Sequence, residues 1–216
     1  MQRFYLLLTL FMFLFLASSV LPAIGQDESQ EPPLSFVVKV DDQSLTLGEG
    51  ETAQIDGAFT NPKVTVTPQP YRVFPYQGVT FKYPRSFAFG ADLVDPNEKI
   101  WTLSGNDLTV MYFVMNAELT TDDYAESMMD EVGAENCEVL DEEAQITLGE
   151  EKLTGKKIRI SVAEQEVVME IYQVPARESV TKFLIFQDTP DESGNRSKEY
   201  VQAIKEIKSS FKVEKE

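Results

Sequence analysis

The sequence predicts an α+β fold in which an antiparallel sheet packs against two amphipathic helices. Three apolar strand-like segments with short polar connections follow one another over residues 157–162, 167–174 and 179–186, a spacing typical of an antiparallel meander. A helix with a capping-box start is expected over residues 120–132. A second helix with one apolar stripe is expected over residues 197–211.

Further strands are expected ahead of the first helix. In residues 78–84, three apolar side chains alternate with polar ones, which indicates a strand with one buried face. Residues 100–103 and 108–115 read as two strands joined by a tight turn at 104–107. The second of these is nearly all apolar, so we expect it inside the sheet. The acidic stretch 138–153 is expected to hold short strands.

The ends of both helices have specific signals. Thr120 and Asp123 have the spacing of a capping box, and Gly133 stands where a helix C-terminus often places glycine. The apolar side chains of the last helix recur at helical spacing and predict its buried face. They are Tyr200, Ile204, Ile207 and Phe211.

The N-terminus has the pattern of a signal peptide over residues 1–25. Arg3 precedes an uncharged apolar run, and small residues at Ala23 and Gly25 favour cleavage before Gln26. The alternative is an uncleaved membrane anchor, because the run is almost long enough to span a bilayer. After cleavage we expect no stable insertion into the membrane. The protein would then be extracytoplasmic, either periplasmic or secreted. Residues 26–33 are acidic and end in proline, which predicts a flexible tail.

Residues 34–70 are predicted to form a small β segment ahead of the main domain, residues 71–216. Strands are expected at 36–40, 44–47 and 64–66. Prolines crowd the joint that follows, together with the aromatic residues Tyr71, Phe74 and Tyr76. Two roles are open for these rings: they dock the β segment on the main domain, or they form an exposed patch for a partner.

Charge narrows the class of partner. The chain has 36 acidic and 19 basic residues and a net charge of −17. Such a surface repels nucleic-acid phosphates and anionic lipid heads, whereas proteins, cationic peptides and divalent cations are compatible with it. The expected partner is therefore a protein, with no nucleic acid. Solubility alone is the alternative explanation of the charge.

The chemistry available to the chain is restricted by its lack of histidine. Catalytic triads, Cys–His pairs and the common zinc sites all need an imidazole or several cysteines, and Cys137 is alone. Acidic neighbours oppose a reactive thiolate at Cys137, which we expect to be buried. We therefore expect no enzyme and no cofactor, and the sequence identifies no catalytic, cofactor-binding or metal-binding residue.

Several features keep weaker functional alternatives open. The loop with Asp188, Asp191, Glu192 and Asn195 offers oxygens to calcium, although its spacing is not that of an EF-hand; the other explanation is a polar connection that caps the last helix. The acidic run 141–143 could also supply metal ligands, and its other explanation is a solvated turn. Trp101 is expected in the sheet core rather than as a ligand platform, and the methionines are expected to fill the core. Paired carboxylates leave a hydrolase as a further alternative.

The order of these pieces resembles the PsbP-like superfamily. The resemblance rests on the strand Phe81–Pro84, Trp101 before a hairpin, the segment Leu153–Lys156 and the final Ser209–Val213, and it covers about residues 71–213. This superfamily includes photosystem II extrinsic proteins, Ran-binding Mog proteins and bacterial DcrB-like proteins. The resemblance implies an α/β/α sandwich around a central antiparallel sheet and a mostly non-catalytic binding or assembly role. It transfers no site residue.

The sequence therefore predicts an exported, non-enzymatic binding or assembly module with an acidic surface. The first alternative is a protein that binds a small ligand or a divalent cation. The second is a carboxylate-based hydrolase.

Overall fold

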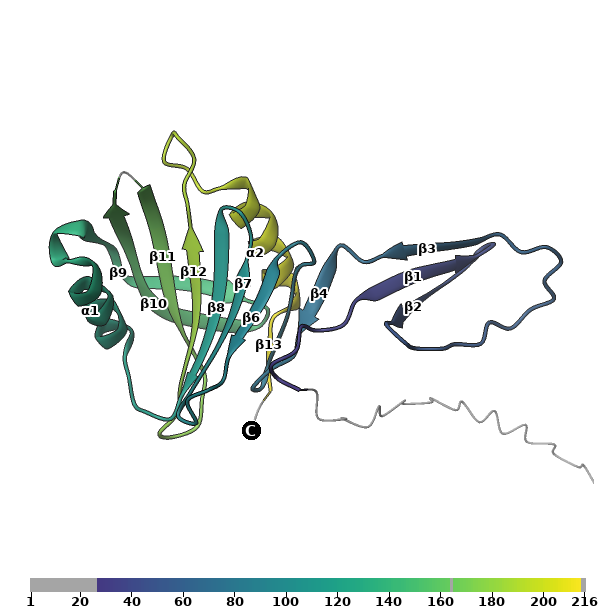
Figure 1. Ribbon diagram of the computed structural model, residues 1–216, viewed down its shortest axis with the longest axis horizontal. Coiled ribbons are helices and arrows are strands. Elements are labelled where there is room, and N and C mark those ends of the chain that lie inside the picture. Colours follow the sequence, from purple (N-terminus) through teal and green to yellow (C-terminus); the bar gives the residue numbers. More distant parts are fainter. Residues whose placement is uncertain (1–26, 164, 215–216) are drawn as a thin grey trace, which may run out of the picture.

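The protein is a β-rich molecule with a main body and a β-stranded arm. The computed structural model describes residues 27–163 and 165–214, so the signal-peptide segment 1–25 lies outside the described residues. Strands account for 49% of the described residues and helices for 15%. Figure 1 shows the arm, residues 34–70, extending away from the large sheet on the side opposite α1.

The main body is built on a seven-stranded antiparallel sheet with the order β6-β7-β8-β12-β11-β10-β9. The expected meander is confirmed, because β10, β11 and β12 are consecutive neighbours, and the strand expected inside the sheet is β8. The strands of this sheet are β6 (Ala88–Asp92), β7 (Glu98–Ser104), β8 (Leu108–Met115), β9 (Cys137–Leu148), β10 (Glu151–Val162), β11 (Gln165–Val174) and β12 (Thr181–Asp188).

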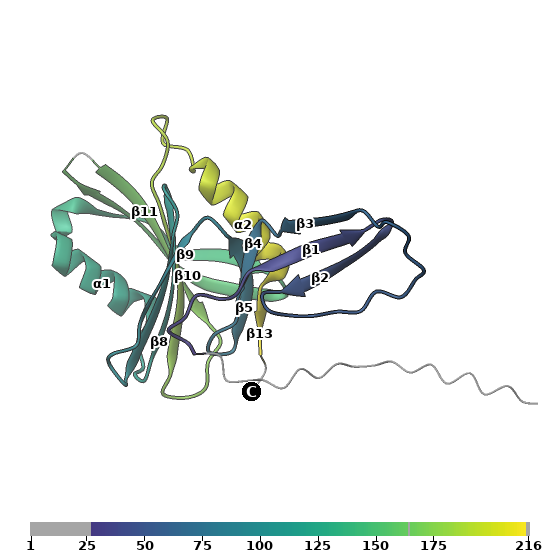
Figure 2. The same ribbon diagram turned by 45° about the vertical axis from the view of Figure 1, so that its right-hand side comes forward.

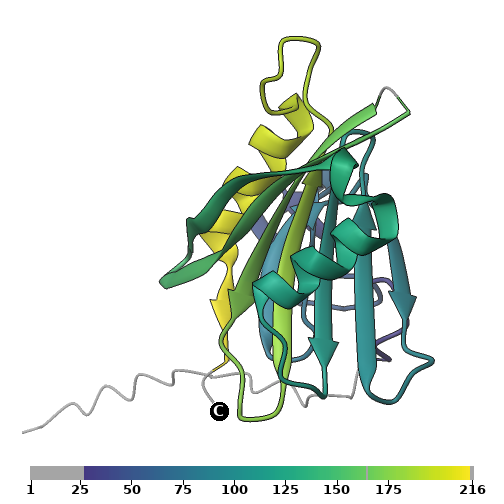
Figure 3. The same cartoon turned by 90° about the vertical axis from the view of Figure 1, so that its left-hand side faces the viewer.

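Each face of this sheet carries its own apolar core. On one face α1 (Thr121–Val132) packs over Ile158, Phe183 and Ile185, as Figure 3 shows from that side. On the opposite face the sheet packs against α2 (Lys198–Ser210) and a three-stranded sheet of order β13-β5-β4. The strands of this second sheet are β4 (Tyr71–Phe74), β5 (Val79–Pro84) and β13 (Lys212–Val213).

The α/β/α sandwich expected from the resemblance is wrong. The structure has three antiparallel sheets and little helix, and strands make up much of the layer that should be helical. The physical reason lies in β5. Alternating buried side chains show that one face of β5 is buried, but they do not show which sheet the strand joins. In the structure β5 pairs with β4 and β13 in the small sheet and not with the large sheet.

Both helices form where the sequence places them. The capping box of α1 is present, with the Thr120 side chain accepting from the Asp123 backbone N–H and the Asp123 carboxylate accepting from Thr120 N–H at 2.7 Å. In α2 the Ser197 hydroxyl accepts from the Tyr200 backbone N–H at 2.9 Å. The predicted stripe of α2 is confirmed by the burial of Ile204, Ile207 and Phe211. Gly133 ends α1 with a positive φ of 91°.

The arm is a three-stranded antiparallel sheet of order β2-β1-β3. Its strands match the three that the sequence predicts for this segment. They are β1 (Ser35–Val40), β2 (Gln43–Gly48) and β3 (Val64–Pro68). None of their residues reaches the burial of the main core, so the arm is a thin sheet with much of its surface in solvent.

Buried tyrosines predict a loss of stability in alkaline solution. Burial is the main cause that raises the pKa of Tyr83 and Tyr172 far above 10, and it raises the pKa of Tyr124 to about 12. Below about pH 10 these tyrosines are protonated in both the folded and the unfolded protein, so they do not change the free energy of unfolding. Above about pH 10 the tyrosines of the unfolded chain ionise first. Each fully buried tyrosine then lowers the free energy of unfolding by up to about 1.4 kcal/mol per pH unit.

We therefore expect the melting temperature to be level between pH 7 and 9 and to fall steeply from about pH 10. Circular dichroism measures the melting, and tyrosinate absorbance follows the ionisation in the same samples. Tyrosinate that forms in the still-folded protein with an ordinary midpoint would contradict the burial of these rings.

Candidate interaction surface

The arm has one apolar face and one polar face. In an antiparallel sheet, directly opposed residues point to the same side, so the register assigns each side chain to a face. Val38 of β1 lies opposite Leu45 of β2 and Val66 of β3. The same alternation gives an apolar face that contains no charged residue. Its members are Phe36, Val38, Val40, Gln43, Leu45, Leu47, Val64, Val66 and Pro68.

This apolar face is open along β3. Val64 is 57% exposed and Val66 is 58% exposed, although both have the size and chemistry of core residues. Near β2, by contrast, the loop of residues 49–63 lies close, and the Gln43 side chain donates to the Asp56 carbonyl at 3.0 Å. Figures 1 and 2 both show this loop running alongside β2. The exposed apolar surface of the arm is therefore concentrated at β3.

The backbone of β3 is open on the same side of the arm. Asp41 N–H donates to the Lys63 carbonyl at 2.9 Å, and Gln69 N–H donates to the Ser35 carbonyl at 2.8 Å. In an antiparallel ladder the bonded residues alternate, so the odd-numbered positions of β3 bond to β1. The peptide groups of Val64 and Val66 consequently point outward, because β3 is the last strand of its sheet. β3 has none of the charged side chains that commonly protect an edge from strand pairing, and only Pro68 at its end limits pairing there.

The segment before the arm is held on the main body. The composition predicts a flexible tail at residues 26–33, whereas in the structure the described part is bound. The Trp101 indole donates to the Glu28 carbonyl at 2.8 Å, and Lys99 pairs with the Glu28 carboxylate at 2.8 Å. Arg72 pairs with Glu31 at 2.9 Å. These bonds outweigh the low apolar content of the segment, and they fix the base of the arm.

The aromatic residues of the joint are packed inside the protein. Phe74 and Tyr76 are buried, and the Tyr76 ring stacks on Trp101 with 5.6 Å between ring centroids. Burial, with Asp27 and Glu28 nearby, raises the pKa of Tyr76. Phe74 and Tyr76 are therefore core residues of the main body and do not form an exposed patch, and the Tyr76 hydroxyl donates to the Gln30 carbonyl in the segment before the arm. The prediction that Trp101 is a core residue is confirmed by its complete burial.

The loop with Asp188 and Asp191 does not assemble a cation site. Asp191 accepts from the backbone N–H groups of Ser193 and Asn195, each at 2.9 Å, and these bonds lower its pKa. Asp188 is fully buried and faces Arg196 at 3.5 Å. Among the described residues, no group of three or more acidic or cysteine side chains is placed to hold a metal ion.

A buried ionic cluster that the sequence did not indicate lies beside this loop. The Arg196 guanidinium pairs with Glu170, which also accepts from the Tyr200 hydroxyl at 2.7 Å. Lys157 lies 3.8 Å from the same carboxylate. Burial first, and then the Glu170 charge, raise the pKa of Tyr200. The cluster joins β11 to the start of α2, so we assign it a structural role.

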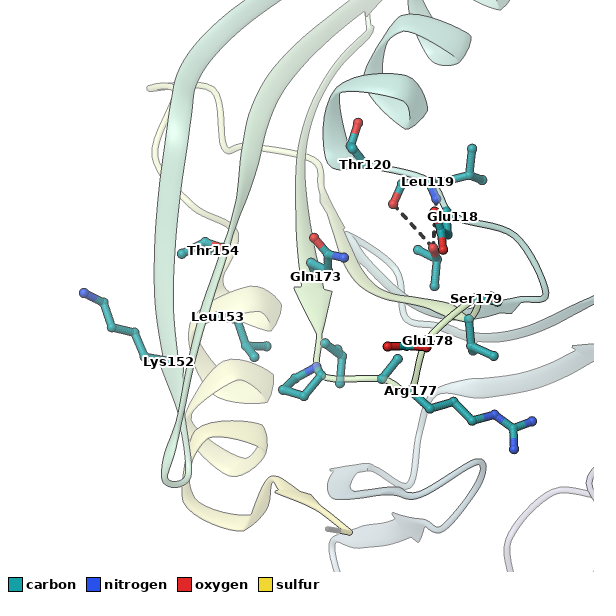
Figure 4. A pocket seen from close by; sticks show the side chains of 15 residues that line it. Glu118, Leu119, Thr120, Lys152, Leu153, Thr154, Gln173, Arg177, Glu178 and Ser179 are labelled. Carbon is teal, nitrogen blue, oxygen red and sulfur yellow. Dashed lines mark hydrogen bonds between the residues drawn. The ribbon is translucent and has the colours of Figure 1, made fainter. Parts of the chain in front are cut away.

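An open cleft lies at one end of the main sheet. Its volume is about 730 Å³, and Figure 4 shows residues from three segments around it. These segments are the approach to α1 at residues 118–120, the start of β10 at 152–154, and the β11–β12 connection. The Thr181 hydroxyl ties two of them together by accepting from Leu119 N–H at 2.9 Å. The lining mixes Lys152 and Arg177 with acidic residues, which suits a small polar molecule.

The remaining candidates have ordinary surroundings. Cys137 is half-buried, whereas the sequence analysis expects a buried side chain. Burial and the nearby Glu135 charge raise the pKa of its thiol, in agreement with the expected unreactive thiol. In the acidic run 141–143, Glu142 pairs with Lys156 at 2.7 Å. Within the described part of the chain, no helix is long and apolar enough to cross a membrane.

Comparisons with known proteins assign no family to this chain. No family model and no curated protein matches it. A crystal structure of a protein from Bacteroides thetaiotaomicron is similar with a TM-score of 0.39 and 10% identity. The match covers 64% of this chain and 46% of that protein, so this chain spans less than half the length of that neighbour. A likeness of this size carries no argument about function.

Proposed function

We propose that this chain is an exported, non-enzymatic binding or assembly module whose partner docks on the arm. The observation that carries the proposal is the meeting of an exposed apolar face and an unpaired strand edge at β3. An added strand would satisfy the outward peptide groups and cover the valines, which is the mode called β-augmentation. Burial of Val64 and Val66 contributes about 1 kcal/mol each.

Charge supports a protein partner whose docking strand is neutral or basic. The chain has a net charge of −17, and the turns and loop around the arm sheet are rich in acids. These acids would repel acidic groups beside an added strand and attract basic ones. They are Asp41, Asp42, Glu49, Glu51 and Asp56. The resemblance to PsbP-like proteins stays a proposal and is consistent with an assembly role outside the cytoplasm.

Site-specific photo-cross-linking tests this function. A photoreactive amino acid at Val64 is expected to give a stoichiometric cross-link to a protein in the native envelope or medium. The matched control is Thr46, an exposed residue on the opposite, polar face of the same sheet. We expect at least tenfold less product at Thr46. Equal labelling at the two positions, or no product at either, would count against docking on the arm.

The alternative that we propose is a small-ligand-binding protein, and the cleft alone supports it. A panel of amino acids and small dicarboxylates at millimolar concentration should then raise the melting temperature, since a ligand of the folded state stabilises it. The Arg177→Glu variant should lose that shift. Calcium and manganese at the same concentration are expected to give none, because Asp191 is engaged by backbone N–H groups. A panel without any shift would remove this alternative.

A further inference from the structure

We infer that the arm pairs with the arm of a second copy of this chain, with β3 running antiparallel to β3 of the copy about a two-fold axis. This inference rests on the proposed function, because it names the partner of the same surface. The pairing would join two three-stranded sheets into one six-stranded sheet. Their apolar faces would become continuous.

The first support is the backbone pattern of β3. An antiparallel register that overlaps all of β3 places Val66 opposite Val66 of the copy and Val64 opposite Pro68. The outward N–H and C=O groups of the two Val66 residues then bond to each other. The Val64 N–H donates to the Pro68 carbonyl, but Pro68 has no N–H, so each Val64 carbonyl lacks its bond across this pair and the pairing is weaker at both ends.

The second support is the match of side chains across this register. Opposed residues share a face, so valine and proline meet on the apolar face. On the other face Thr65 lies opposite Thr67, a pair in which the two hydroxyl groups can bond. A strand that is complementary to itself in this way is what a two-fold dimer requires.

The third support is charge. Two copies of a chain with a net charge of −17 repel each other, so contact is least opposed where a surface carries no charge. β3 has no charged residue, and at its end Lys63 would lie opposite the neutral Gln69. Figure 1 shows that the arm extends away from the main body.

The size of the contact predicts a reversible dimer. β3 has five residues, which corresponds to a length of roughly 17 Å. Such a contact buries less than the roughly 1,000 Å² of a stable interface. We therefore expect the dimer fraction to rise with protein concentration instead of being constant.

The test combines sedimentation with disulfide trapping in the purified protein. Wild-type protein is expected to shift from monomer towards dimer between about 1 µM and 1 mM, consistent with a small interface. The Val66→Lys variant should lose this shift, and Thr46→Lys, on β2 and away from the β3 edge, should keep most of it. Strictly monomeric wild-type protein over the whole range would overturn the inference.

Disulfide trapping tests the register itself. In a Cys137→Ser background, Val66→Cys places two thiols opposite each other at about 5.5 Å between Cα atoms, within disulfide reach. Position 67 instead faces Thr65 of the copy, so Thr67→Cys should oxidise to dimer at least tenfold more slowly. Equal rates would overturn the pairing. If the protein is monomeric but position 64 still cross-links to a different protein, the pairing with a second copy is refuted and the proposed function stands. If the protein is monomeric and position 64 gives no cross-link, the pairing and the proposed function are both refuted.

Discussion

Replacing Gly155 by alanine is expected to destabilise the protein by about 3 kcal/mol or more, the range of a severe core clash. Gly155 lies inside β10, between β9 and β11, where the pairing with β9 shifts its register. A Cβ atom at this position would lie 1.8 Å from the Ile171 carbonyl oxygen and 2.9 Å from the Tyr172 Cα. Both are backbone atoms of β11, so the sheet itself would have to move.

This clash matters because the register shift that follows Gly155 lies within the β9–β10 hairpin. Ile146, Leu148 and Leu153 of that hairpin belong to the same apolar core as Ile207 of α2. Ile158, three residues after Gly155, belongs to the core under α1. Opening the strands at Gly155 would therefore loosen both cores.

Thermal melting measures the effect, and Gly90→Ala is the matched control. Gly90 also lies in a strand of the same sheet, but the nearest atom to a new Cβ there is 3.9 Å away. We expect Gly155→Ala to lower the melting temperature by roughly 6–12 °C, the size effect for a domain of this length. Gly90→Ala should stay close to wild type. If the two variants melted alike, the close approach of β10 and β11 would be wrong.

The sequence predicted local elements well because their signals are local. The capping box at Thr120 and Asp123 and the stripe of α2 need only neighbouring residues to be recognised, and both are present. The meander was predicted equally well, because short connections force consecutive strands to pair. The three strands of the arm were also found from alternation and turn residues.

The assignment of strands to sheets could not be predicted in the same way. The alternation in Val79, Phe81 and Tyr83 shows that one face is buried, but not what it packs on. β13 pairs with β5 across more than half of the chain, and only the folded structure reveals that contact. The α/β/α expectation failed at this point.

The candidate site was missed for a related reason. The residues of the arm's apolar face were identified as strand residues, yet an apolar alternation normally means a buried face. Only the structure shows that Val64 and Val66 remain exposed. The absence of any charge on β3 was the one signal in the sequence that an edge had been left unprotected.

Removing the Arg196 charge should cost about 3–5 kcal/mol, the usual penalty for breaking a buried ion pair. Arg196→Met leaves Glu170, which is 6% exposed, and Asp188, which is fully buried, without their nearest cation. Lys157, at 3.8 Å from Glu170, offers only partial compensation. The expected fall in melting temperature is roughly 6–20 °C.

Two controls separate this electrostatic cause from lost packing. Arg159→Met removes an exposed ion pair with Glu138 and Glu166 and should leave the melting temperature almost unchanged. Adding Glu170→Gln to Arg196→Met should recover part of the loss, because it removes the uncompensated charge. A double variant that is less stable than Arg196→Met would contradict this explanation.

The same variant decides what the loop of residues 188–196 does. If Arg196 is its internal cation, calcium cannot replace it, because Asp191 stays engaged by backbone N–H groups and Asp188 stays buried. Arg196→Met should then melt at the same temperature with and without millimolar calcium. Rescue by calcium would show instead that the loop can bind a cation, and it would move the search for function from the arm to this end of the sheet.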